Sequence, residues 1–483
     1  MKKLKLIFAT LLAAFLAFTG GKALAYDITV DGGNGTYESY QIFTGTLSED
    51  GTTLSNIKWG NGITEAGQTA LQTKYGVSSA AELAEVLGAE DFTASQAEEF
   101  AKAAGQYLQN AGGLTGLAAG YYLVQNATVG SNEAYTNYIL QVVNNVTVEP
   151  KTSVPSVEKK VKDTNDTTGE TTDWQDSADY DINDSVPFQL TATLPANLDS
   201  YDEYYLELSD TLSSGLTYNK DAKVYLVNDD EKTDVTSSFT IADDGSSFKI
   251  NNLKSLDGVT SSTKVVVEYT ATLNENAVIG SEGNPNTVKL IYSNNPNYTG
   301  SGETSPTGET PEDTVIVFTY KVVVNKVDQD GAALPGAGFT LYKKVNGEWT
   351  AVKTISADEA TAAENSDKKN IFTFSGLDDG DYKLSETTTP NGYNTIDDVE
   401  FTVTADHDIT SDSPALNSVT GTGSLEFTSN TTAGSLTTDV VNKKGSVLPS
   451  TGGMGTTILY VVGTILVLAA GILLVTKKRM DAK

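Results

Sequence analysis

Residues 321–331 read KVVVNKVDQDG, a short apolar run that ends in an Asp/Gly turn. Val322, Val324 and Lys326 alternate with their neighbours, so a β-strand would place these three side chains on one face. A lysine on the face that the valines bury is costly unless it is neutralised or paired. The stretch therefore predicts a strand of a β core and, inside that core, a lysine that needs partners.

Two later stretches supply polar side chains on similar faces. Glu386 alternates with the apolar residues of YKLSETTTPNGY (382–393), and Asn442 with those of TTDVVNKKG (437–445). Burial lowers the pKa of a lysine and raises that of a glutamate, so the amine can become a nucleophile and the acid a proton shuttle. An attack on the asparagine amide would expel ammonia and leave an isopeptide cross-link. Closing a loop of roughly a hundred residues would contribute on the order of 4–5 kcal/mol, by analogy with a disulfide.

The same region resembles a known family. KVDQDGAALPGAGFTLY (326–342), LSETTTPNGY (384–393) and VVNKKGSVLPSTGG (440–453) are similar to the C-terminal domain of Gram-positive backbone pilins, which has the collagen-binding-protein B-type fold. ETTTPNGY matches the ETxxPxGY pattern of the family's E-box, with Glu386 inside it. The resemblance implies a Lys326–Asn442 bond formed with Glu386 as the catalytic residue.

The remainder of the chain predicts an all-β fold of tandem Ig-like sandwich domains. Short alternating runs separated by Gly, Asn, Asp and Ser turns continue through most of the sequence. Helical spacing of Ala, Leu and Glu interrupts them only in 65–118, where Ser79 with Glu82 and Ser95 with Glu98 have capping-box spacing. We expect an N-terminal domain at 26–149 with short helical insertions, a middle domain at 150–313 and a C-terminal domain at 314–447.

The middle domain resembles the family's isopeptide-forming middle domain. In SVEKKVKD (156–163), Lys159 shares the parity of the flanking valines, which makes it the expected nucleophile, with Lys160 as the alternative. Asn286 alternates with the apolar residues of NTVKLIYS and is the expected amide. The acid is less clearly marked: Asp210 stands at the family's D-T-L position, and Glu207 and Asp184 are the weaker candidates.

The N-terminal domain departs from this pattern. Its opening strands contain no lysine before Lys58, and Gln125 stands where an acid would be required. We therefore expect no cross-link in this domain.

The two ends of the chain predict export and anchoring. Residues 1–25 have a basic start, an apolar middle and small residues before the expected cleavage point, which is typical of a secretory signal peptide. Residues 456–476 carry no charge and are long enough to cross a membrane, and the basic tail 477–483 follows. The preceding LPSTG resembles the LPxTG sorting signal, which sortases cut between Thr and Gly; its residues are Leu448, Pro449, Ser450, Thr451 and Gly452.

Composition excludes several kinds of site. The chain has no cysteine and one histidine, and its formal net charge is −31. Disulfides, thiol catalysis and thiolate metal sites are therefore excluded, and the acidity argues against nucleic acid as a partner. His407 lies in a polar ADHD stretch that predicts a surface loop. We expect no cofactor and no metal site, and interpret Asp328–Asp330 as a hairpin turn rather than a Ca²⁺ loop.

One further lysine lies in a predicted linker between domains. Lys151 follows Pro150 between the first two predicted domains, where the family carries a YPK pilin motif, although Glu149 stands at the tyrosine position. The resemblance implies that a pilin-specific sortase joins the Lys151 amine to Thr451 of another copy.

The sequence therefore predicts a structural, non-enzymatic backbone subunit of a covalently polymerised pilus on the cell surface. Its expected partners are other copies of itself, pilin-specific and housekeeping sortases, peptidoglycan, and tip or base pilins. The alternative is a monomeric wall-anchored adhesin for a host or matrix protein. A wall-bound hydrolase is disfavoured because no paired-acid motif stands out.

Overall fold

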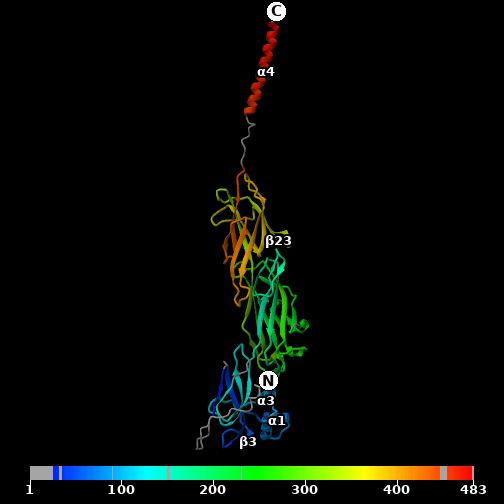
Figure 1. Ribbon diagram of the computed structural model, residues 1–483, viewed down its shortest axis with the longest axis vertical. Coiled ribbons are helices and arrows are strands. Elements are labelled where there is room, and N and C mark those ends of the chain that lie inside the picture. Colours follow the sequence, from blue (N-terminus) through cyan, green and yellow to red (C-terminus); the bar gives the residue numbers. More distant parts are fainter. Residues whose placement is uncertain are drawn as a thin grey trace.

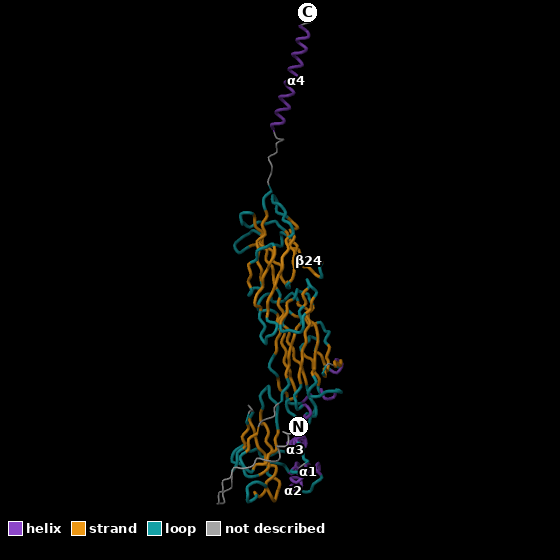
Figure 2. Tube along the Cα trace, in the orientation of Figure 1, coloured by secondary structure: helices purple, strands orange, loops and turns teal. Residues whose placement is uncertain are grey.

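The computed structural model of the chain describes residues 25–31, 35–89, 91–148, 153–229, 231–445 and 454–480. These residues form three β-rich domains in single file, with a separate helix beyond the third (Figures 1 and 2). Nearly all of the predicted signal peptide, together with Lys151 and the LPSTG pentapeptide, lies outside the described residues. The all-β prediction with tandem sandwich domains is confirmed.

The first domain combines a four-stranded sheet with three helices. The sheet has the strand order β3-β2-β4-β5, and β1 pairs in parallel with β6. The helices bury Leu71, Leu83 and Phe100 in the same core as Ile42 and Phe43 of the sheet. The elements are β1 (Ile28–Val30), β2 (Thr36–Leu47), β3 (Leu54–Trp59), α1 (Glu65–Tyr75), α2 (Ala80–Leu87), α3 (Ala94–Gly105), β4 (Gly120–Thr128), β5 (Asn137–Val142) and β6 (Val146–Val148).

The helices begin close to the predicted caps, with one correction. Ser79 caps α2 by accepting a hydrogen bond from the Glu82 amide, but the Glu82 carboxylate turns to Ser78 instead of completing the box. The box predicted at Ser95 and Glu98 is wrong. The cap of α3 is Thr93, which forms a complete capping box with Gln96 because this pair has the same spacing two residues earlier.

The second domain is a sandwich of two mainly antiparallel sheets. One has the order β10-β21-β19-β12-β17-β16 with β20 on β19, and the other β15-β14-β18-β11-β7 with β13 on β18. Their inner faces share one core. The strands are β7 (Ser156–Val161), β8 (Thr164–Asn165), β9 (Glu170–Thr171), β10 (Ser177–Asp179), β11 (Ser185–Thr193), β12 (Leu206–Leu212), β13 (Leu216–Tyr218), β14 (Lys223–Asn228), β15 (Glu231–Asp234), β16 (Thr240–Ile241), β17 (Ser247–Ile250), β18 (Lys264–Leu273), β19 (Asn284–Ser293), β20 (Thr307–Glu309) and β21 (Asp313–Phe318), with single 3₁₀ turns at Leu198–Ser200, Thr236–Ser238, Leu253–Ser255 and Gly302–Thr304.

The position of β21 corrects the predicted start of the third domain at 314. This strand pairs with β19 and β10, so residues 314–318 belong to the sheet of the second domain. Thr319 separates β21 from the first strand of the third domain. The chain passes from one domain to the next through a sequence that looks like one continuous strand.

The third domain is a second sandwich. One sheet has the order β25-β26-β22-β31-β30 and the other β24-β23-β27-β28-β29. β22 and β31 run parallel, although they come from the two ends of the domain, and Lys326 is in register with Val440. The strands are β22 (Tyr320–Asp328), β23 (Gly338–Val345), β24 (Glu348–Ile355), β25 (Thr361–Ala362), β26 (Lys369–Leu377), β27 (Gly380–Thr388), β28 (Val399–His407), β29 (Leu416–Gly423), β30 (Thr428–Asn430) and β31 (Ser435–Asn442).

The chain ends in the helix α4 (Met454–Met480), which makes no contact with the domains in Figure 1. Residues 458–478 within it are apolar enough to cross a membrane, and none of that window is buried against the protein. Their exposed leucine, isoleucine and valine side chains would be costly to leave in water, so the helix suits a lipid environment.

Candidate functional site: two buried lysine–asparagine pairs

The second domain buries a lysine directly against an asparagine. Lys159 on β7 is 0 % exposed, and its Nζ lies 2.7 Å from Oδ1 of Asn286 on β19. The same ammonium forms a short ion pair with Asp210 on β12. All three side chains point into the space between the two sheets, as the alternation of each strand predicted. The structure therefore brings together the predicted amine, the predicted amide and the first of the three candidate acids.

A tyrosine that the sequence did not single out completes this group. Tyr269 on β18 donates a hydrogen bond to Oδ2 of Asp210 at 2.5 Å and accepts one from Nδ2 of Asn286 at 2.7 Å. Burial, and then the Asp210 carboxylate, raise its pKa well above the usual value, so the phenol stays protonated. Tyr269 therefore holds the acid and the amide in place, on either side of the amine.

Burial also decides the protonation of the amine. Desolvation lowers the pKa of Lys159 to about 8, and the opposing charge of Asp210 is not enough to cancel the effect. The rings of Phe188 and Tyr269 lie 5.6 and 5.7 Å from Nζ and line the pocket. An amine with this pKa has a substantial neutral fraction near neutral pH, which a nucleophile requires.

The other candidates in this domain lie elsewhere. Lys160 points outward and pairs with Asp176 at 2.6 Å. Glu207 accepts hydrogen bonds from Ser247 and Tyr205, and Asp184 accepts one from the backbone of Asp181. In the part of the chain that the structure describes, Asp210 is the candidate carboxyl that contacts Lys159.

The third domain places its three predicted residues around one end of the β22–β31 pair. Lys326 and Asn442 are both 0 % exposed, and Glu386 on β27 is 9 % exposed. Nδ2 of Asn442 donates to both carboxylate oxygens of Glu386, at 2.8 and 3.1 Å. Nζ of Lys326 donates a hydrogen bond to the Val440 carbonyl at 2.7 Å. Its ammonium is therefore bound two residues before Asn442 on β31.

Two features suit this second group to the same reaction. Burial lowers the pKa of Lys326 to about 8, against the opposing effect of Glu386. Oδ1 of Asn442 is buried and has no hydrogen-bond partner among the described residues. A buried carbonyl oxygen without a donor is costly, and the amide is held by its nitrogen alone. A turn of the Lys326 side chain away from the Val440 carbonyl would bring the amine towards this amide.

The depressed pKa of Lys326 has a measurable consequence when no bond can form. In Asn442→Ala the amine keeps its Val440 partner, and its pKa of about 8 lies below the value of 10.5 for a free lysine. The unfolded state then binds more protons between these values, so the free energy of unfolding of the third domain should rise with pH from about 8 to 10, by up to about 1.4 kcal/mol per unit. Above pH 10 ionisation of the buried tyrosines in the unfolded state would oppose the rise. Urea denaturation at several pH values measures it.

A cross-linked wild type has no titrating amine here and should show no such rise, so equal slopes in the two proteins would contradict the assignment.

The first domain has no comparable group among its described residues. Lys58 is exposed, Lys74 pairs with Glu99 on the surface, and Lys102 pairs with Asp202 of the second domain at 2.7 Å. Gln125 is half-buried on β4. These positions are compatible with the expected absence of a cross-link.

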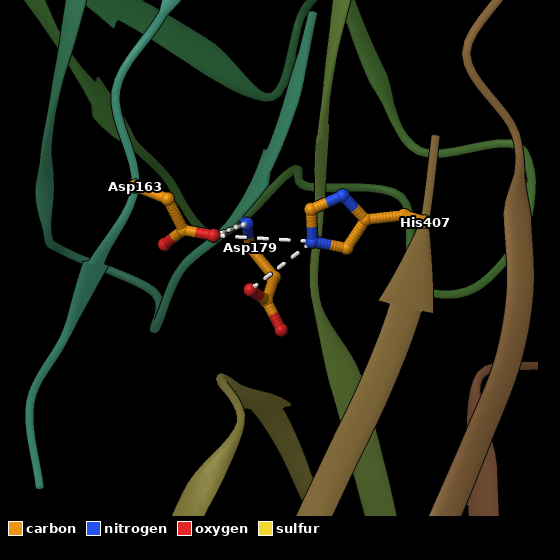
Figure 3. Close-up of side chains that lie close together, drawn as sticks. All are labelled: Asp163, Asp179 and His407. Carbon is orange, nitrogen blue, oxygen red and sulfur yellow. Dashed lines mark hydrogen bonds and ion pairs between the residues drawn. The ribbon is translucent and has the colours of Figure 1, made fainter. Parts of the chain in front are cut away.

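The prediction for His407 is corrected. It closes the strand β28 rather than lying in a surface loop, and its side chain is 8 % exposed. It faces Asp163 and Asp179 of the second domain across the domain junction (Figure 3). No local pattern indicates this contact, because the partners are more than two hundred residues away along the chain.

Comparisons with known proteins agree with this architecture. Residues 182–296 match the model of a Gram-positive pilin backbone subunit 2, Cna-B-like domain; residues 320–414 match a prealbumin-like fold domain; and residues 440–482 match the LPXTG cell wall anchor motif. The trypsin-resistant surface T6 protein of Streptococcus pyogenes serotype M6 is 26% identical over 426 residues, which cover 80% of this chain and 74% of that protein.

A solved structure shows the same fold. The T6 backbone pilin of serotype M6 Streptococcus pyogenes, described as a modular three-domain structure, superimposes with a TM-score of 0.57 at 19% identity, over 89% of this chain and 100% of that chain. The full-length major pilin SpaD from Corynebacterium diphtheriae gives a TM-score of 0.45 at 16% identity, over 87% of this chain and 97% of that one.

Proposed function

The chain is a Gram-positive backbone pilin with an LPXTG cell-wall anchor, and from this premise we propose that its copies are joined covalently into a fibre and that each copy is locked internally by two isopeptide bonds. The main support for the internal bonds is the 2.7 Å contact between Nζ of Lys159 and Oδ1 of Asn286, which is buried from solvent beside a carboxyl group. A structural protein without cysteine gains from such bonds the stability that disulfides give elsewhere.

The second domain supports the following sequence of steps. The Lys159 ammonium transfers a proton to Asp210, and the neutral Nζ attacks Cγ of Asn286. The Nζ–Cγ bond forms and the Cγ–Nδ2 bond breaks. A proton from the attacking amine completes the leaving ammonia, which departs as ammonium with the proton that Asp210 held. Tyr269 is a positioning residue, since it contacts both the acid and the amide.

The third domain would react in the same way with Lys326, Asn442 and Glu386. A hydrogen bond already holds the amide of Asn442 against the carboxylate of Glu386. The amine must first leave the Val440 carbonyl. Because β22 and β31 are the first and last strands of this domain, the bond would tie its two ends together. A pulling force along the chain would then pass through the Lys326–Asn442 bond and bypass the rest of the domain.

For assembly, we propose that sortase joins Thr451 of one copy to the Lys151 amine of the next. Both residues lie outside the described part of the chain. The proposal is supported by the LPXTG match over 440–482 and by the place of Lys151 in the sequence between the first two domains. The single-file arrangement of the domains also suits head-to-tail growth, since a contact between two different surfaces builds filaments rather than closed rings (Figure 1).

Surface extracts on a denaturing gel test the assembly. Wild-type cells should yield a ladder of high-molecular-weight species, and Lys151→Ala should reduce it to monomer while the protein still reaches the surface. Lys160→Ala is a matched control, because this lysine is near in sequence, is only partly buried and pairs with Asp176 outside the Lys159–Asn286 contact. A ladder that persists in Lys151→Ala would refute the linkage at this lysine. Monomer alone in the wild type, with the sortase present, would favour the monomeric adhesin instead.

A further inference from the structure

The junction of the second and third domains contains a group of buried acids around the only histidine. Asp163 follows β7 and Asp179 ends β10, both in the second domain, while His407 ends β28 of the third. One ligand atom from each of these three residues lies within 4.8 Å of the other two (Figure 3). Asp179 belongs to a second such group with Asp378 and Asp379 of the third domain. The two groups are therefore continuous across the junction.

The hydrogen bonds of His407 fix the proton on its ring. The Ser177 hydroxyl donates its single proton to the Asp408 carbonyl at 2.6 Å, so towards Nδ1 of His407, 2.7 Å away, it can only accept. Nδ1 is therefore the protonated nitrogen, and in the neutral ring Nε2 carries a lone pair. This lone pair faces Oδ1 of Asp179 at 3.6 Å and Oδ2 of Asp163 at 3.8 Å, both too long for hydrogen bonds.

Among the described residues, no lysine forms an ion pair with Asp163 or Asp179. The side chain of Lys343, the buried lysine at the junction, already binds Asp166, Asp181 and Asp378. Asp179 is 3 % exposed, and its Oδ2 has no hydrogen-bond partner among the described residues. The hydroxyl of Tyr320 is buried close to Asp179, and burial together with this carboxylate raises the pKa of the phenol well above its usual value, so Tyr320 keeps a proton that it can donate towards Asp179. An unpaired buried carboxylate is costly, so the group requires either protons or a cation.

We propose that Nε2 of His407 and the carboxylates of Asp163 and Asp179 bind one divalent metal cation that joins the second and third domains. Nε2 lies 3.6 and 3.8 Å from the two carboxylate oxygens, and ligand atoms that each lie about 2.0–2.4 Å from one shared metal ion are separated by distances of this size. Asp379 is placed to supply a further oxygen through the group that it shares with Asp179. The hydrogen bond from Nδ1 to Ser177 is the kind of outer contact that orients a ligating histidine.

The ligand set favours Zn²⁺ or Mn²⁺ over Ca²⁺. Imidazole nitrogen is a good ligand for Zn²⁺ and a poor one for Ca²⁺, which takes six to eight oxygens. The metal would link the two domains reversibly, whereas the isopeptide bond proposed inside each domain would be permanent.

Metal binding is tested with the untagged full-length chain in detergent, since a histidine tag would compete with the single natural histidine. The protein is stripped with a chelator and titrated with Zn²⁺ alone, and bound metal is counted after equilibrium dialysis. We expect one Zn²⁺ per chain in the wild type. His407→Gln and Asp179→Asn should weaken binding at least about tenfold, and Ser177→Ala, which removes only the orienting contact, by about 10–100-fold. Asp330→Asn, in an acidic turn of the third domain, should change nothing.

A second measurement needs no variant. Because the chain has one histidine, selective ¹³C labelling gives NMR ring signals that belong to His407 alone. Zn²⁺ should shift them. A wild type that binds neither Zn²⁺ nor Mn²⁺, or ring signals that Zn²⁺ leaves unchanged, would overturn the proposal. Binding of Ca²⁺ without Zn²⁺, or an undiminished affinity for Zn²⁺ in a folded His407→Gln protein, would do the same.

Discussion

Replacing Lys159 with methionine is expected to destabilise the second domain more than replacing Asn286 with alanine, although either change removes the same cross-link. Both variants should retain one ammonia that the wild type loses, and so sit about 17 Da above the wild type after correction for the substitution. Loss of the bond alone should cost on the order of 4–5 kcal/mol, since it closes a loop of 127 residues. Asn286→Ala should show this loss, because in the uncross-linked variant the Lys159 ammonium can pair with the buried Asp210 carboxylate.

Lys159→Met also leaves Asp210 without the lysine partner that it keeps in Asn286→Ala. Asp210 is 2 % exposed and would keep only the Tyr269 hydroxyl as a partner, so an uncompensated buried charge should add about 3–5 kcal/mol. Methionine fills nearly the same volume, which limits any contribution from a cavity. Intact-mass spectrometry measures the bond, and denaturant unfolding measures stability, with Trp174 as the tryptophan of this domain.

A double variant separates the two contributions. Lys159→Met with Asp210→Leu removes the buried charge together with the bond, so its stability should return to that of Asn286→Ala. If both single variants had the mass of a cross-linked chain, the assignment of the bond would be wrong. If Lys159→Met were no less stable than Asn286→Ala, the burial of Asp210 would carry no energetic weight.

Strand alternation explains why the buried lysines and asparagines could be located from the sequence. Lys159, Lys326 and Asn442 each lie on a strand whose apolar residues share their parity, and a period of two fixes the face of the sheet without any knowledge of its partners. The pattern does not say which of several acids comes opposite the amine. Only the family resemblance favoured Asp210 over Glu207. In the structure, the pairing of β12 with β19 fixes the position of Asp210.

The features that the sequence missed depend on contacts between distant segments. Tyr269 has the parity of Val265 and Val267, so it reads as an ordinary core aromatic until the sandwich places it beside Asp210. β21 and β22 read as one strand because only Thr319 separates them, with no Gly or Pro to mark a turn. The acids of the junction come from loops and strand ends of two domains, and no local pattern connects them.

Replacing Lys343 with methionine is expected to uncouple the second and third domains. Its ammonium lies 3.0 Å from Asp166 and 2.7 Å from Asp181 of the second domain, and 2.9 Å from Asp378 of the third. Lys343 is 2 % exposed, and burial alone would oppose its charge, but Asp378 and Asp181 outweigh that effect and raise its pKa. Removing one partner of such a buried group typically costs about 3–5 kcal/mol. The loss should appear as separate unfolding transitions in calorimetry and as a broader distribution of shapes in X-ray scattering.

The adjacent Lys344 provides the matched control. Its side chain is 37% exposed and pairs with Asp381 at 3.5 Å, so Lys344→Met should change stability by no more than about 1 kcal/mol. Equal effects of the two substitutions would mean that the junction does not depend on the buried charge.

The loss in Lys343→Met should also depend on pH. Burial raises the pKa of Asp378 well above its usual value, and removal of the lysine would raise it further. Above pH 4 the folded variant would therefore bind more protons than its unfolded state, so its stability should fall as pH rises. The deficit relative to wild type should be smaller at pH 5 than at pH 8, because at the lower pH a proton replaces the missing ammonium. A deficit independent of pH would point to lost packing, since methionine and lysine differ little in apolar contact but fully in charge.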